Sequence, residues 1–141
     1  MTELSMTRLY ALRAAYLILG GGLALTIWPR LLDQPADWPV MGSVVAAMLG
    51  GLSLMALLGL RYPLRMLPIL LFEFAWKAIW LGLVALPRWL DGSLDDRMMA
   101  TVADCAVIAI LMPLIPWRHV VATYVRAPGT PWRTAGTAKP A

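Results

Sequence analysis

Residues 40–60, VMGSVVAAMLGGLSLMALLGL, form an apolar stretch without a single charged side chain. As a helix, this stretch would rise about 30 Å, which is the thickness of the hydrocarbon core of a bilayer. Residues 10–28, 66–86 and 98–115 form three further stretches of similar character. The segments lack the alternation of barrel strands, and lipid cannot satisfy open backbone groups, so we expect helices. The sequence therefore predicts an all-α membrane protein with four transmembrane helices.

The composition of the chain supports this class. Of its 141 residues, 60% are hydrophobic and 14% are charged, whereas soluble domains carry about 25% charged residues. The single cysteine excludes an intrachain disulfide, and with only one histidine the chain lacks the usual zinc, iron–sulfur and multi-histidine ligand sets. We therefore expect no metal site and assign no cofactor. Despite the net charge of +4, no nucleic-acid-binding motif is present, so we expect no nucleic-acid partner.

Short connections rich in helix breakers join the four segments. They comprise residues 29–39, the basic turn 61–65 and residues 87–97. Short links imply that consecutive helices are antiparallel neighbours. We therefore predict that residues 1–127 form one domain, an antiparallel bundle of four transmembrane helices.

The basic residues indicate an orientation in the membrane. The chain ends and the second connection carry eight of the 12 Lys and Arg residues, whereas the first and third connections carry three. Basic residues near helix ends stay on the cytoplasmic side, so we expect both termini in the cytoplasm of a bacterial inner membrane. The eight are Arg8, Arg13, Arg61, Arg65, Arg118, Arg126, Arg133 and Lys139, and the three are Arg30, Arg88 and Arg97.

The C-terminal region is expected to lie on the inner surface of the membrane. A short helix over residues 117–126 would place Arg118 and Arg126 on one side, where they can contact acidic lipid headgroups. His119 has no second titratable partner nearby, which favours a surface role over a ligand role. Residues 128–141 are rich in Pro, Gly, Thr and Ala, and we expect a flexible cytoplasmic tail there.

Small residues recur at four-residue spacing in the second helix. They form two adjoining stripes: Gly42, Ala46 and Gly50, and beside them Ser43, Ala47 and Gly51. Small side chains let helix backbones approach closely in lipid, so we expect these stripes to pack against other helices. The sequence leaves open whether the neighbour belongs to the same chain, a homodimer or a membrane protein complex.

The third segment carries two charged residues near its middle, Glu73 and Lys77. Four residues apart in acid-before-base order, they lie on one helix face and can form an ion pair. Trp76 and Trp80 fall on the same side. A charge at this depth costs about 2.5–3.5 kcal/mol on insertion scales, so these side chains are expected to face the interior of the bundle.

Asp104 lies in the fourth segment. Folding the last two helices as a hairpin puts it about one turn from Lys77, so we expect Lys77 to bridge Glu73 and Asp104 in a buried cluster. Two acids and one base leave a surplus negative charge, which a proton, a cation or a basic partner would relieve. The cluster either fixes the register of the helices or forms an ion path, proton relay or ligand site with Trp76 and Trp80.

Within about the first 65 residues, several features follow the arrangement of a known family. They are Arg13 opening the first helix, Gly20–Gly22 within it, Pro29 ending it, and Gly50-Gly51 and Gly59-Leu60 in the second helix. In these features the chain resembles small DoxX-like four-helix bacterial membrane proteins. The resemblance implies an association with respiratory or redox membrane complexes. The stretch from Glu73 to Lys77 is not part of it.

These observations lead to two hypotheses about function. The first is a non-enzymatic inner-membrane protein, either an accessory protein or one that binds a small ligand or lipid. The second is a small proton- or cation-coupled transporter, working as a dimer. An integral-membrane enzyme ranks third, because the sequence shows no nucleophile–base pair, metal cluster or phosphate loop.

Overall fold

Residues 4–132, which the computed structural model describes, fold almost entirely into helices, and no β-strand occurs among them. Four helical segments are long and apolar enough to cross a membrane: Met6–Asp33, Val40–Gly59, Leu67–Leu90 and Asp96–Leu114. They coincide with the four predicted spans, so the chain has the helices of a multi-pass membrane protein. Arg133, Lys139 and most of the predicted tail lie outside the described residues.

The first two spans are single helices, α1 (Met6–Asp33) and α2 (Val40–Gly59). The prediction that Pro29 would end the first helix was wrong, because Pro29 lies inside α1. Proline removes one backbone hydrogen bond, but the neighbouring bonds of a long helix hold the turn that follows. Gln34, in a left-handed conformation with a φ of 41°, ends α1 instead.

The third span changes its helix type near the middle. It consists of three consecutive elements: α3 (Leu67–Trp80), the π-helix η1 (Leu81–Ala85) and α4 (Leu86–Leu90). In the π-helical part, the Leu86 amide bonds to the Leu81 carbonyl five residues back. Pro87 follows directly and has no N–H with which to continue an α-helical ladder. The switch therefore falls where the sequence interrupts normal hydrogen bonding.

The backbone of the fourth span stays helical throughout, but its hydrogen bonding tightens near the middle, at Ala106 and Val107. It consists of α5 (Asp96–Cys105) and α6 (Ile108–Leu114), which a turn at residues 106–107 separates. Neither glycine nor proline stands at this turn, so the hydropathy pattern gave no sign of it. The helix predicted over residues 117–126 is present as α7 (Trp117–Val120), continued by the π-helix η2 (Val121–Arg126).

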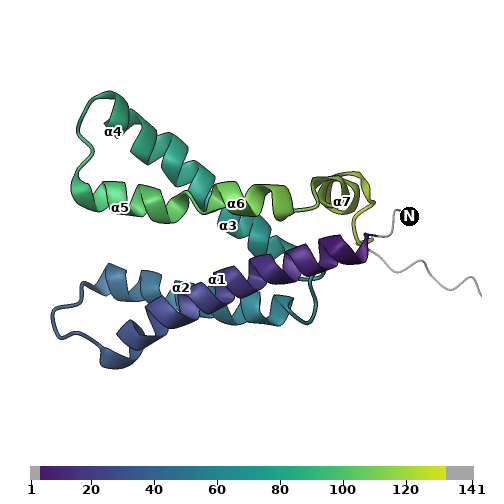
Figure 1. Ribbon diagram of the computed structural model, residues 1–141, viewed down its shortest axis with the longest axis horizontal. Coiled ribbons are helices and arrows are strands. Elements are labelled where there is room, and N and C mark those ends of the chain that lie inside the picture. The colour runs from purple at the N-terminus through teal and green to yellow at the C-terminus, as the bar shows by residue number, and fades with distance from the viewer. Residues whose placement is uncertain (1–3, 133–141) are drawn as a thin grey trace, which may run out of the picture.

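The spans pair as two antiparallel hairpins (Figure 1), α1 with α2 and the third span with the fourth. The hairpins meet at the terminal end, by which we mean the end holding the start of α1, residues 60–66 and α7. They diverge toward the loop end, which holds residues 34–39 and 91–95. Between the hairpins, α1 contacts α6 and α2 contacts α3. The four spans are thus not packed together along their whole length.

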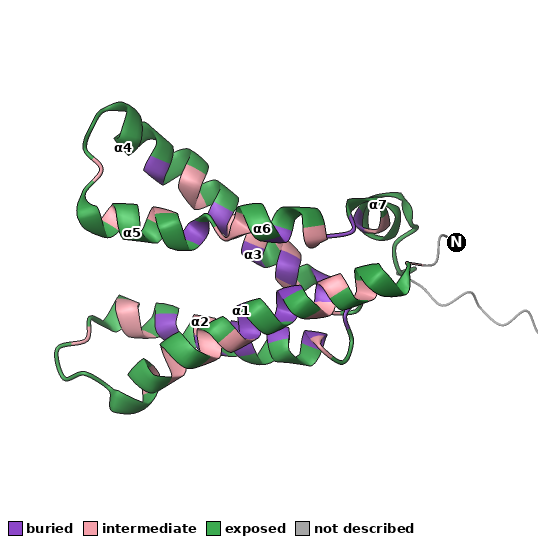
Figure 2. Cartoon of the chain, in the orientation of Figure 1, coloured by how far each residue is buried: buried purple, intermediate pink, exposed green. Residues whose placement is uncertain are grey.

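The apolar core lies where the hairpins meet. In Figure 2, buried residues gather on the terminal halves of the spans, while the loop-end halves are mostly exposed. Tyr16 is fully buried there, and its hydroxyl donates a 2.7 Å hydrogen bond to the Pro63 carbonyl. The core comprises Leu12, Ala15, Tyr16, Leu19, Ala56, Leu67, Leu70, Leu111, Ile115 and Val120.

Small residues let α1 and α2 approach closely, but only one of the two predicted stripes contributes to this contact. Ala46 and Gly50 are buried, and a Cβ atom at Gly50 would lie 3.0 Å from the Leu31 side chain. Ser53 adds a buried hydrogen bond of 2.9 Å to the Gly20 carbonyl. In the second stripe, Ala47 and Gly51 are exposed and Ser43 is half-buried, so that stripe contributes little to the contact between α1 and α2.

Candidate functional site

Glu73 and Lys77 form a buried ion pair on α3, as the sequence predicted. The Lys77 Nζ atom lies 2.6 Å from Glu73 Oε1, and the side chains are 10% and 2% exposed, respectively. The pair lies on the face of α3 that also contributes Leu70 to the core. Because the two residues are one helical turn apart, the helix itself fixes their contact.

Trp76 completes the hydrogen bonding of this pair. Its indole N–H donates a 2.7 Å hydrogen bond to Glu73 Oε2, and its ring centroid lies 5.4 Å from Lys77 Nζ. Both carboxylate oxygens are therefore occupied, and the opposite charges cancel. Trp80 is half-buried one turn further along. The group is a neutral, internally satisfied unit rather than one with a surplus charge.

The predicted Glu–Lys–Asp cluster is corrected in one member, because Asp104 is exposed and forms no ion pair with Lys77. Cys105 takes the buried position instead, with an exposed fraction of 1%. The charges that act on its thiol are those of Lys77, Asp104 and Glu73. The expected helix face of Asp104 was therefore wrong.

Helical geometry explains why Asp104 points elsewhere. The covered face of α5 carries Met98, Val102 and Cys105, spaced four and three residues apart. Asp104 is one residue from Cys105, so its side chain is rotated by about 100° from that face. Thr101 lies three residues before Asp104 and is also exposed, which gives α5 an exposed polar edge. The spacing of these apolar residues in the sequence therefore indicated that Asp104 lies off the covered face.

Two backbone irregularities lie close to the ion pair. The π-helix η1 begins four residues after Lys77, and the tightened turn of the fourth span follows directly after Cys105. π-helical turns occur frequently at functional sites. Hydropathy reports where a chain meets lipid and not how its backbone bonds, so the sequence did not reveal either feature.

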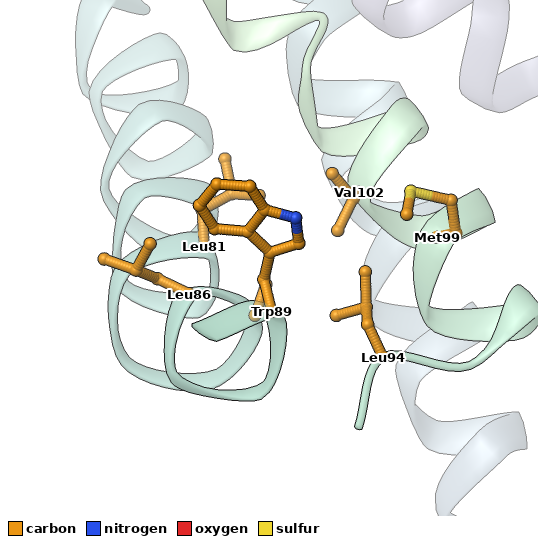
Figure 3. Close-up of a pocket in the computed structure, with 7 residues that line it drawn as sticks. Leu81, Leu86, Trp89, Leu94, Met99 and Val102 are labelled. Carbon is orange, nitrogen blue, oxygen red and sulfur yellow. The ribbon is translucent and has the colours of Figure 1, made fainter. Parts of the chain in front are cut away.

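An apolar pocket of about 260 Å³ lies between the third and fourth spans toward the loop end. Figure 3 shows the Trp89 ring between Leu81 and Leu86 of the third span on one side and Met99 and Val102 of the fourth span on the other, with Leu94 of the connection beside them. The pocket is slightly smaller than typical small-molecule sites of about 300–1,000 Å³. No charged side chain lines it, so it offers an apolar group room but no polar anchor.

The residues proposed to contact lipid headgroups lie on the short helix after the fourth span. Arg118 and Arg126 are exposed, while His119 is half-buried and lies 3.3 Å from the Thr123 hydroxyl. Both arginines are free to meet an anionic surface. Among the described residues, no group of three or more His, Cys, Asp and Glu side chains is placed to hold a metal ion.

Comparisons of the chain with protein-family models, with curated proteins and with solved structures give no match. They therefore neither support nor contradict the resemblance to DoxX-like proteins.

Proposed function

We propose that the chain is a non-enzymatic accessory protein of a membrane complex, and that it docks on a partner through α5. One observation carries the proposal, the exposed carboxylate of Asp104 within a membrane span. Asp104 lies about 12 Å from the start of the fourth span and about 15 Å from its end, at 1.5 Å per residue. A carboxylate at that depth is unfavourable against lipid unless it is paired.

The charge of Asp104 defines the chemistry of the partner. A transmembrane helix with a Lys or Arg at the same depth would neutralise the carboxylate. On the same face, the Thr101 hydroxyl donates to the Arg97 carbonyl at 3.0 Å and can still accept a hydrogen bond. The fourth span also has the most exposed surface of the four, since only 11% of its apolar stretch is buried within the chain. The occupant of this face is therefore a basic helix of another protein.

A second copy of the chain does not supply the required cation. Among the described residues, Lys77 is the basic group at the middle of a span, and Glu73 already pairs with it. Arg13 lies toward the terminal end and donates its Nε hydrogen to the Leu60 carbonyl at 3.1 Å. Two symmetric copies meeting at this face would also bring their Asp104 carboxylates together, which is unfavourable.

Site-specific photo-crosslinking in native cell membranes tests the proposal. With p-benzoylphenylalanine replacing Thr101, we expect an adduct on a transmembrane helix that carries Lys or Arg near the cross-link. Asp104→Asn should lower its yield about tenfold, which corresponds to about 1.4 kcal/mol. Asp104→Lys should abolish it, and an acidic residue in place of the partner's basic residue should restore it.

A control locates the contact, and two results would overturn the proposal. The same photoreactive residue in place of the exposed Val44 on α2 should not give this adduct. The proposal fails if Asp104→Asn leaves the yield unchanged. It also fails if the product at position 101 contains only lipid or a second copy of this chain.

We propose that the protein lies in a bacterial inner membrane with both termini in the cytoplasm. The arrangement of charge supports this orientation. The terminal end carries Arg8, Arg61 and Arg65 as well as the two arginines of the short C-terminal helix, whereas Asp33 and Asp91 lie toward the loop end. Basic ends face the cytoplasm. Association with a respiratory or redox complex, as the DoxX-like layout implies, would be one setting for such an accessory protein.

A second candidate function is proton- or cation-coupled transport. The π-helix after Trp80 favours it, because π-helical turns are frequent at functional sites. The neutral Glu73–Lys77 pair weighs against it, since that pair has no spare charge. Liposomes containing the protein should show flux that Asp104→Asn abolishes. Flux equal to that of protein-free liposomes would exclude transport.

A further inference from the structure

A groove of about 400 Å³ runs between the loop-end halves of α1 and α2. Met41, Val45 and Leu49 of α2 line it at four-residue spacing, so they form one apolar ridge about 12 Å long. Met41 and Val45 are 71% and 51% exposed. The groove therefore gives an extended apolar chain a continuous surface along the helix.

The loop end of the groove is polar. Arg30 and Trp38 line it there, and among residues 4–132 Arg30 has no ion-pair partner and the Trp38 indole N–H has no hydrogen-bond acceptor. A Cβ at Gly42 would lie 3.1 Å from Trp38 Nε1, so the absence of a side chain at Gly42 lets the indole lie over α2. Asp33 and Asp37 belong to the same connection, but neither lines the groove. The apolar groove therefore has one cation and one N–H donor at its loop end.

The geometry points to a phospholipid site in this groove, with an acyl chain along Met41, Val45 and Leu49 and the lipid phosphate on Arg30 and Trp38. Guanidinium groups bind phosphate oxygens strongly, and indole rings prefer the headgroup region of a bilayer. The apolar pocket beside Trp89 differs in this respect, because no charged side chain lines it. The groove between α1 and α2 combines a charge with an apolar surface. This combination favours an amphipathic ligand over a purely apolar one.

Native mass spectrometry tests the site in the full-length protein. The protein would be reconstituted in vesicles of phosphatidylglycerol and phosphatidylcholine, extracted in mild detergent and examined for retained phosphatidylglycerol. We expect one molecule to stay bound per chain. Arg30→Gln should lower the occupancy about tenfold, the change that corresponds to about 1.4 kcal/mol. Arg88→Gln, on α4 near the other loop-end connection, is the charge control and should leave the occupancy unchanged.

A second pair of variants tests the apolar part of the groove without changing charge. Val45→Trp should obstruct the acyl chain and lower the occupancy, whereas Val44→Trp on the adjacent face should not. Both positions are exposed, so neither variant disturbs the core. The proposal is overturned if Arg30→Gln and Arg88→Gln have equal effects, if Val45→Trp retains the lipid, or if diacylglycerol, which has no phosphate, binds as well as phosphatidylglycerol. Retention of inorganic phosphate instead of lipid would overturn it too.

Discussion

Lys77 and Glu73 stabilise the protein only as a pair, because each satisfies a charge that its surroundings cannot solvate. Their contact of 2.6 Å and the indole hydrogen bond from Trp76 leave no free carboxylate oxygen. In a buried site the cost of desolvating two charges can equal the gain from their attraction. Removal of one partner therefore has a different consequence from removal of both.

We expect Lys77→Met to destabilise the fold by about 3–5 kcal/mol, since it leaves the Glu73 carboxylate buried without a counter-charge. The double variant Glu73→Leu, Lys77→Met should recover most of this loss. Thermal unfolding in detergent, followed by circular dichroism, measures both, with Arg61→Met as an exposed control. Equal destabilisation in the single and double variants would contradict the prediction.

Asp91, in the connection between the third and fourth spans, gives a pH dependence. Hydrogen bonds from the Ser93 hydroxyl and amide hold the pKa of Asp91 below its usual range. Because the folded pKa is depressed, the stabilisation of this turn is complete above the usual value of about 3.9 and is lost as pH falls through the lower folded value. Ser93→Ala should raise the pKa, as measured by NMR titration of the carboxyl carbon. The distant variant Ser43→Ala should leave it unchanged, and a Ser93→Ala variant with the original pKa would show that the hydroxyl is not responsible.

The helices themselves follow from the hydropathy pattern, but their irregularities do not. The span predicted at residues 40–60 is α2 almost residue for residue, because an uncharged stretch in lipid can satisfy its backbone only as a helix. The π-helix and the tightened turn at residues 106–107 depend on local hydrogen bonding and tertiary contacts, which hydropathy does not report. The prediction for Asp104 was wrong in the direction of its side chain. Depth follows from counting residues, whereas direction depends on which face of α5 is covered.

The close approach of α1 and α2 gives a prediction at the level of these elements. A Cβ atom at Gly59 would overlap the Tyr16 ring, while a Cβ at Gly51 would meet nothing within 4 Å. We expect Gly59→Ala to destabilise the hairpin by about 1–3 kcal/mol through overpacking. Gly51→Ala should be neutral or slightly stabilising, because alanine favours helix. Unfolding in detergent compares the two variants, and equal stabilities would contradict the packing described for Tyr16.

The whole molecule is asymmetric in both packing and charge. The hairpins share a core at the terminal end, and the same end carries most of the basic residues that flank the spans. The loop end has less buried surface, and both the Asp104 face and the lipid groove lie on the poorly covered parts of the hairpins. The two proposed contacts, with a partner helix and with a phospholipid, thus cover surface that the chain does not bury itself.

The charge asymmetry predicts how the molecule lies across the membrane, and cysteine labelling in intact cells tests it. Cys105 is the only cysteine in the sequence and is buried, so Cys105→Ser gives a background without a reactive thiol. In that background, Ser93→Cys at the loop end should react with a membrane-impermeant maleimide added outside the cell. Tyr62→Cys and Thr130→Cys should react only after the membrane is permeabilised, because the proposed orientation places the basic terminal end in the cytoplasm. The reverse pattern would contradict the orientation. Different behaviour of positions 62 and 130 would contradict the number of spans between them.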